Sequence, residues 1–403
     1  MKILFYGETP VIETGAARVD RHILDVIVEM GIEVEMIAMS HPYESPYGHD
    51  MIRYPFPITG VSSHEEASKL IADILLTHPD YALFISADAH VPMLTLPAVK
   101  PRLTMILAAI DGEVMFPQQV SYMRNVEVPA VYSHYSEAQL ARHGIKAHCI
   151  PLGCEPDVFY PLSAEERRAY RRKAFDIGDE TFLVICANRN QRRKDLPRAM
   201  AAFHKFQQRV PDSRLYMHAL QEDVGGDLRS QAKFLGLGKE VIFTPPALTI
   251  HSGFERPVLN RIYNAADVGI STALGEGWGL TTTEIMSAGT PFIGPANTTF
   301  FELLGEQRGY LAKCGGDDLW QIAHGSDDMP RPQTSVTDMA GLLYHVYSHR
   351  EEAKERAARA RRWAEQHTWH AFKEAWKGVL EHEVKFVAPD SAGCTDSSRS
   401  MAL

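Results

Sequence analysis

Short apolar runs alternate with helix-like segments along most of the chain, and this alternation limits the possible folds more than any other feature. "KILFYG" (residues 2–7) has the character of a buried strand, and residues 15–31 then place Val19 and Ile23 at helical spacing. Further strand-like runs follow at residues 33–39, 81–86, 103–110, 130–134 and 148–153. Such alternation predicts a parallel sheet with helices on both faces.

A second alternating series follows a charged segment at residues 162–180, which we expect to be a surface helix or linker. This series begins with the strand-like "TFLVICA" (residues 181–187). Its later strand candidates lie at residues 214–219, 241–245, 267–273, 291–296 and 309–313. The last part, residues 341–382, indicates long helices broken near His367–Thr368. The sequence therefore predicts an α/β protein with two doubly wound domains.

Composition excludes several classes of protein. The net charge of −10 argues against a general affinity for nucleic acid or anionic membranes. Five cysteines without CxxC spacing favour reduced thiols over a disulfide framework or a zinc site. No run approaches the roughly 20 apolar residues of a membrane span. We expect a cytoplasmic protein with no stable membrane insertion.

Three glycine-containing or basic loops follow predicted strands, where doubly wound sheets bind ligands. Gly15 stands in the turn after the first strand and before a helix, an arrangement that suits an anion or an ordinary turn. "ANRNQRRKD" (residues 187–195) presents Arg189 and Lys194, which suit a phosphate or form a solvated basic loop. Nucleic acid is the lesser option here, because no aromatic residues are interleaved with the charges.

The third loop opens the stretch "GEGWGLTTTEIMSAGTPF" (residues 275–292). Its glycines, Gly277 and Gly279 among them, allow backbone N–H groups to face an anion, and the helix expected from about Thr282 adds its dipole. Thr281 and Glu284 have the spacing of a capping box.

Glu276, by contrast, has no capping role, and carboxylates accept hydrogen bonds from vicinal hydroxyls. An acidic pair beside a basic loop therefore predicts a nucleotide sugar as ligand. A glycosidase-like carboxylate pair is the alternative, although Glu284 at a helix N-terminus would be a poor general acid.

The chain resembles the retaining glycosyltransferases of GT-B architecture, glycosyltransferase family four and its relatives. "EGWGLTTTE" is similar to their E-x7-E signature, and "NRNQRRKD" to their "GRLxxxKG" element. "GAARV", "IPLGCEPDVFYP" and "HTWHAF" resemble further family segments in the family's order, and "FFELL" supplies a later glutamate, Glu302. The similarity covers roughly residues 1–380 and is stronger in the second half.

The resemblance implies a role for each matching residue. Arg189 and Lys194 would neutralise the diphosphate leaving group, and Glu284 would bind the ribose hydroxyls. Glu276 would bind the hydroxyls of the transferred sugar. Backbone N–H groups around the donor phosphates or sugar would come from Gly15, Gly279, Leu280 and Thr281, with Gly277 in the same loop.

Two positions depart from the family pattern in the first domain. Asp111 stands where the family often has a histidine, and it could bind a sugar hydroxyl, act as a base or occupy an ordinary turn. His90 is an alternative to it, and His134 we expect to be structural. Thr14 replaces the first glycine of the usual pair, which weakens the expectation of close phosphate contact there.

These features together predict two facing Rossmann-like domains, at residues 1–162 on the acceptor side and 163–365 for the nucleotide sugar. A C-terminal helix (residues 366–385) would return to the first domain, before a disordered tail (residues 386–403).

The predicted activity is retaining, metal-independent sugar transfer from a nucleotide-diphosphate donor, with no cofactor and no metal, since no D-x-D triplet occurs. The acceptor hydroxyl is unidentified and could belong to a glycan, a lipid-linked sugar, a small molecule or, less readily, a modified nucleic acid. Alternatives are a nucleotide-sugar epimerase and a non-catalytic nucleotide-sugar-binding protein.

Overall fold

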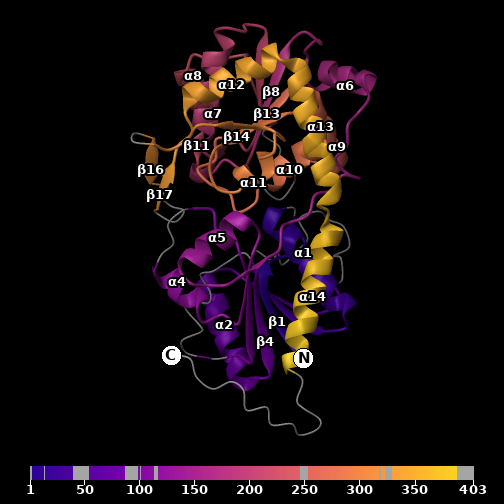
Figure 1. The fold of residues 1–403 in the computed structure, drawn as a ribbon, viewed down its shortest axis with the longest axis vertical. Coiled ribbons are helices and arrows are strands. Elements are labelled where there is room, and N and C mark those ends of the chain that lie inside the picture. Colours follow the sequence, from indigo (N-terminus) through magenta and orange to yellow (C-terminus); the bar gives the residue numbers. More distant parts are fainter. Residues whose placement is uncertain are drawn as a thin grey trace.

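The chain forms two α/β units stacked along the long axis of the molecule (Figure 1). The computed structural model describes residues 2–12, 14–39, 54–86, 99, 101–112, 117–245, 253–316, 319–322 and 329–387. Both large sheets are parallel, and in each the strand order reverses between two neighbouring strands, as in a Rossmann fold. The predicted α/β class with two Rossmann-like domains is confirmed.

The first domain contains a seven-stranded sheet in the order β3-β2-β1-β4-β5-β6-β7. Its strands are β1 (Lys2–Glu8), β2 (Glu33–Met39), β3 (Ile58–Val61), β4 (Tyr81–Ser86), β5 (Leu103–Ala108), β6 (Val128–Val131) and β7 (His148–Cys149). Its helices are α1 (Gly15–Glu29), α2 (His64–Thr77), α4 (Pro117–Met123) and α5 (His134–Arg142). β3 was not anticipated from the sequence, because it is only four residues long and its side chains are mostly half-exposed.

The second domain contains a six-stranded sheet in the order β12-β9-β8-β13-β14-β15. Its strands are β8 (Phe182–Ala187), β9 (Ser213–His218), β12 (Val241–Phe243), β13 (Val268–Ile270), β14 (Phe292–Pro295) and β15 (Tyr310–Ala312). Its helices are α6 (Ala164–Tyr170), α7 (Leu196–Gln207), α8 (Leu228–Phe234), α9 (Arg256–Ala265), α10 (Leu280–Ser287), α11 (Phe300–Leu304), α12 (Val336–Ser348) and α13 (Arg350–Gln366). Two small antiparallel hairpins join it, β10–β11 (Glu222–Asp223 with Gly226–Asp227) and β16–β17 (Trp320–Ile322 with Pro330–Pro332).

Alternating side chains of each strand feed cores on opposite faces of the sheets. In β1, Phe5 joins one hydrophobic cluster and Tyr6 another. In β8, Leu183 joins the same cluster as Phe5, whereas Phe182 joins the core on the far face of the second sheet. One apolar cluster therefore runs continuously from the first domain into the second.

The C-terminal helix α14 (Trp369–Val387) runs along the first domain, whereas α13 lies on the second (Figure 1). Trp369 stacks on His22 of α1, with ring centroids 4.0 Å apart, and Lys373 Nζ lies 2.8 Å from Asp25 Oδ2. The predicted break near His367–Thr368 is confirmed, because α13 ends at Gln366 and α14 begins at Trp369.

The two segments that cross between the domains touch each other. The Cys154 N–H donates to the His367 carbonyl at 2.7 Å. A side chain at Gly153 would overlap the Trp369 backbone, so only glycine allows this close approach. The predicted boundaries of the domains remain a prediction, and residues 388–403 of the predicted tail lie outside the described residues.

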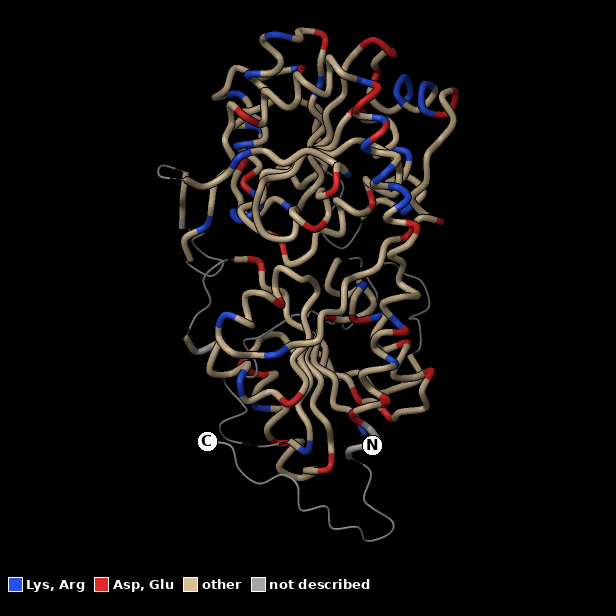
Figure 2. The backbone as a smooth tube through the Cα atoms, viewed as in Figure 1, with Lys and Arg blue, Asp and Glu red and all other residues tan. Residues whose placement is uncertain are grey.

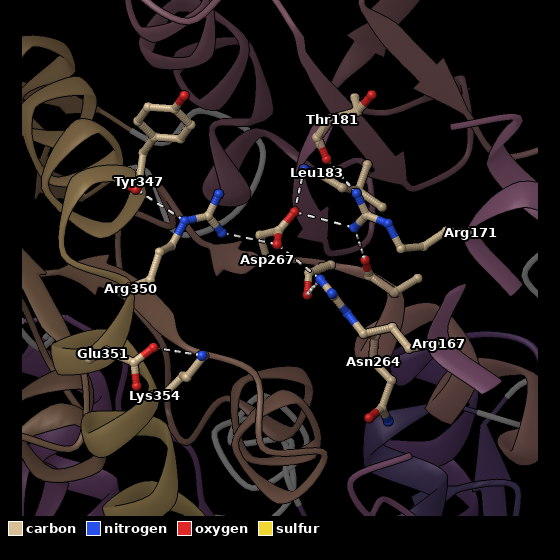
Figure 3. Close-up of polar contacts among 12 residues, drawn as sticks. Arg167, Arg171, Thr181, Leu183, Asn264, Asp267, Tyr347, Arg350, Glu351 and Lys354 are labelled. Atoms are coloured by element: carbon tan, nitrogen blue, oxygen red, sulfur yellow. Dashed lines mark hydrogen bonds and ion pairs between the residues drawn. The ribbon is translucent and has the colours of Figure 1, made fainter. Parts of the chain in front are cut away.

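The charged segment after the first domain folds as α6 followed by a π-helical turn, and the positions of its Lys and Arg residues are blue along the backbone in Figure 2. Arg171 of this turn is fully buried and pairs with Asp267, the residue before β13, at 3.2 Å (Figure 3). Arg167 and Arg350 bind the other oxygen of the same carboxylate at 2.9 and 3.0 Å. The network fixes α6, the π-helical turn and the start of α13 at the amino-terminal ends of β8 and β13.

Within the described part of the chain, the helices are all too short or too polar to cross a membrane.

Candidate functional site

Two loops of the second domain meet where its sheet reverses strand order. β8 and β13 are neighbours, and the loops that follow them hold residues 188–195 and 271–279. The Leu274 N–H donates to the Arg193 carbonyl, and Thr272 Oγ1 donates to the Asp195 carbonyl, each at 2.8 Å. The loops are therefore fixed to each other at the crevice where open α/β sheets bind ligands.

Lys194 and Glu276 form a nearly buried ion pair in this crevice. Lys194 Nζ lies 2.5 Å from Glu276 Oε1, and Arg193 Nη1 lies 3.4 Å from Oε2. The Glu276 N–H donates to Thr298 Oγ1 at 3.0 Å, so the loop after β14 holds the backbone at this residue. Burial lowers the pKa of Lys194, an effect that Arg193 reinforces and Glu276 opposes.

Asp111 approaches the same group from the first domain, where it follows β5. Arg193 Nη1 lies 3.0 Å from Asp111 Oδ2, and Arg331 Nη2 of β17 lies 2.7 Å from Oδ1. Arg331 also donates to the Asp111 backbone carbonyl. Burial alone would raise the pKa of Asp111, but the two guanidinium groups outweigh it and hold that pKa below its ordinary value. His90, the alternative to Asp111, lies outside the described residues.

Arg189 is not part of this cluster, although it belongs to the same basic loop as Lys194. Its Nε lies 3.0 Å from Asp223 Oδ2 in the β10–β11 hairpin, and about half of its side chain (49%) is exposed. The sequence pattern paired Arg189 with Lys194, whereas in the structure Arg193 occupies the position beside Lys194.

Glu284 binds residues from both domains. Its Oε1 lies 2.6 Å from Arg18 Nη1 of α1, and its Oε2 accepts a hydrogen bond of 2.8 Å from Tyr263. Arg18 also lies 3.2 Å from Glu155 in the segment that connects the domains. The carboxylate thus sits at the domain interface with only 9% of its side chain exposed.

The predicted capping box at Thr281 and Glu284 is wrong. α10 begins at Leu280, its N-cap is Gly279, and no side chain caps it. Gly279 has a φ of +108°, a conformation that side chains rarely adopt, so the glycine itself turns the chain into the helix. The Glu284 side chain does not cap the start of α10 and pairs instead with Arg18.

The glycines of the loop after β13 allow the first domain to approach closely. A side chain at Gly275 would overlap the Asp111 carbonyl oxygen, and one at Gly277 would crowd Ala109. Across the same interface, a Cβ at Gly15 would lie 3.3 Å from a methyl group of Leu280. Gly15, Gly275 and Gly277 therefore line the contact between the domains.

Thr14, the departure from the glycine pair, has a clear local role. Its Oγ1 donates to Glu8 Oε2 at 2.6 Å and accepts the Ala17 N–H at 3.1 Å, which caps α1. The Thr14 side chain thus stabilises the start of α1, at a position where the family pattern has a glycine.

A further interdomain contact joins Glu302 of α11 to the first turn of α5. Its carboxylate accepts the His134 N–H at 3.1 Å and the Tyr135 N–H at 2.6 Å. Sequence reasoning assigned no partner to Glu302 and did not identify Arg18 or Arg331 as site residues. Each of these contacts joins residues more than 160 positions apart, which no local spacing reveals.

Residues 168–324, which include all six strands of the second sheet, match the family model "Glycosyl transferases group 1". The chain is 28% identical over 154 residues to mannosylfructose-phosphate synthase of Agrobacterium fabrum, covering 36% of this chain and 32% of that protein. It is 23% identical over 266 residues to D-inositol 3-phosphate glycosyltransferase of Jonesia denitrificans, covering 64% of this chain and 56% of that protein. The matches thus span about a third and just over half of these curated relatives.

The fold is shared over nearly the whole chain. The Anabaena protein Alr3699/HepE, solved in complex with UDP-glucose, superposes with a TM-score of 0.68 over 95% of this chain and 100% of its own. The sequence identity is 15%, so this likeness shows the fold alone.

Proposed function

We propose that this chain, whose second domain carries the group 1 glycosyltransferase region, transfers a sugar from a nucleotide diphosphate to an acceptor hydroxyl with retention of anomeric configuration and without a metal ion. The observation that carries the proposal is the buried Lys194–Glu276 pair, which stands at the switch point of the second sheet and faces the first domain. The complex of Alr3699/HepE with UDP-glucose supports UDP-glucose as the first donor to test.

The charge of the cluster suits a diphosphate. It holds three cations, Arg193, Lys194 and Arg331, against the two carboxylates of Glu276 and Asp111, an excess of one positive charge. The N-terminus of α10 adds a partial positive charge nearby. Preorganised cations and dipoles stabilise a departing diphosphate, so the transfer needs no metal ion.

Donor binding would rearrange the Lys194–Glu276 pair. A phosphate oxygen takes Lys194, and Glu276 is then released to accept hydrogen bonds from the hydroxyls of the sugar. In that state the negative charge of the phosphate lies beside Lys194 and raises the pKa of the lysine back toward its ordinary value. The first domain carries the acceptor and closes over the donor.

Glu284 would bind the ribose while it stays fixed by Arg18 and Tyr263. A carboxylate offers about four acceptor positions. The two contacts described above leave room for the ribose hydroxyls. Because Arg18 belongs to the first domain, ribose recognition depends on domain closure.

Asp111 would orient the cluster rather than act as a base. Its carboxylate lies between two arginines that hold it ionised, which makes it a weak proton acceptor. In the mechanism that the family resemblance implies, the departing phosphate assists deprotonation of the acceptor, so a protein base is not required.

Calorimetric titration with a panel of nucleotide sugars tests the donor site. Lys194→Ala and Glu284→Ala are each expected to weaken donor binding at least tenfold, about 1.4 kcal/mol or more. Lys354→Ala is the matched control, because Lys354 is exposed and pairs with exposed Glu351 on α13 (Figure 3). Unchanged donor binding in both site variants, with folding intact by circular dichroism, overturns the assignment.

A further inference from the structure

We propose that His134, Glu137 and Cys149 form a binding site for a zinc-type divalent cation at the domain interface. His134 and Glu137 lie three residues apart on α5, and Cys149 ends the edge strand β7. One ligand atom from each lies within 4.8 Å of the other two. These residues are separate from those to which the donor role is assigned.

The donor set fits a borderline-soft cation. Imidazole, thiolate and carboxylate are the ligands that Zn²⁺ takes, whereas Mg²⁺ and Ca²⁺ prefer oxygen alone. Three protein ligands leave a fourth tetrahedral position for water or a further group.

The geometry requires only small side-chain shifts. His134 Nδ1 and Glu137 Oε2 already lie 3.0 Å apart, and ligands around a tetrahedral Zn²⁺ lie about 3.5 Å apart. The side chains of His134 and Glu137 are 71% and 42% exposed, so both can turn toward Cys149. The thiol is held in place by the strand.

Cys149 must lose its proton to bind the ion. Burial, with Glu137 and Glu302 adding to it, raises the pKa of the Cys149 thiol to about 12. The same two carboxylates that disfavour a thiolate favour a cation beside it. Metal uptake should therefore release a proton and strengthen as the pH rises.

Glu302 connects this site to domain closure. It comes from the second domain and binds the N–H groups at the start of α5, next to His134. A helix N-terminus repels a cation, and Glu302 offsets that repulsion only while the domains are closed. The bound ion therefore favours the closed arrangement.

Co²⁺ and Zn²⁺ titrations of the full chain test the site. Wild-type protein should bind a single Co²⁺ and show a thiolate-to-cobalt charge-transfer band, which Zn²⁺ then displaces. Cys149→Ser and His134→Ala should abolish the band, whereas Cys314→Ser, which removes another partly buried thiol, should keep it. Glu302→Gln should weaken Co²⁺ binding about fivefold, as the loss of one nearby charge predicts.

Wild-type protein that shows no such band, or a band that survives Cys149→Ser, overturns the proposal. An unchanged Co²⁺ affinity in Glu302→Gln overturns the coupling to closure. None of these readouts depends on sugar transfer, so the metal site and the donor site are tested independently of each other.

Discussion

The substitution Glu276→Gln is expected to tighten binding of a free nucleoside diphosphate while it weakens recognition of the sugar. Lys194 donates to Glu276 at 2.5 Å, and only 11% of the lysine side chain is exposed. A phosphate must displace this carboxylate before it can use Lys194. Glutamine has nearly the same shape but no charge, so it gives up the lysine more easily.

The size of the change in UDP affinity follows from the Lys194–Glu276 hydrogen bond that the phosphate replaces. A hydrogen bond between charged groups contributes about 1.5–3 kcal/mol. Release of Lys194 should therefore strengthen UDP binding by about tenfold, which corresponds to 1.4 kcal/mol. The nucleotide sugar gains the same benefit but loses a charge-assisted bond to its hydroxyls, so its affinity should fall relative to that of UDP by about tenfold or more.

Calorimetry of UDP and UDP-glucose against wild-type protein and Glu276→Gln gives the two affinities directly. Glu351→Gln, at an exposed position of α13, is the matched control and should change neither. The variant leaves Lys194 buried with less compensation and should unfold at a lower temperature, so titrations belong well below its Tm. Equal loss of affinity for both ligands would refute competition between Glu276 and phosphate for Lys194.

Three further predictions concern the interface and the core. Arg331→Ala removes an interdomain ion pair and should increase the radius of gyration measured by small-angle X-ray scattering; an unchanged radius contradicts a role in closure. Gly153→Ala should lower the free energy of unfolding by about 1–3 kcal/mol, whereas Gly178→Ala, where a Cβ meets open space, should be nearly neutral. Burial lowers the pKa of His22 from 6.5 to about 3, so the unfolded chain binds a proton first and stability rises with pH between these values. His22→Phe keeps the stack on Trp369 and should flatten that pH dependence in chemical denaturation; an unchanged slope contradicts the assignment.

The strand–helix alternation predicted both sheets because burial on two faces leaves a continuous apolar run in each central strand. β8, for example, is buried at every residue. Since the ends of parallel strands lie on one edge, the loops at residues 188–195 and 271–279 were expected to meet, and hydrogen bonds join them. The resemblance to the E-x7-E signature assigned a role to each matching residue of these loops, and these roles remain predictions.

The interdomain contacts could not be predicted in the same way. Arg18 and Glu284 are 266 positions apart, and Arg331 and Asp111 are 220 apart, so no periodicity relates them. The capping box failed for a local reason: α10 begins at Leu280 with Gly279 as its N-cap, so Thr281 lies inside the helix and cannot cap it. Cysteine spacing argued against a zinc site, because only one of the proposed ligands is a cysteine and the other two are a histidine and a glutamate of the preceding helix.

The most direct test of the account is the product of the reaction. Proton NMR can follow the protein with its best-binding donor in EDTA, with and without a mixture of hydroxyl acceptors. We predict a new anomeric signal with the configuration of the donor, which appears only when an acceptor is present. Conversion of the nucleotide sugar without any acceptor, an inverted product, or a requirement for added metal would contradict retaining, metal-independent transfer.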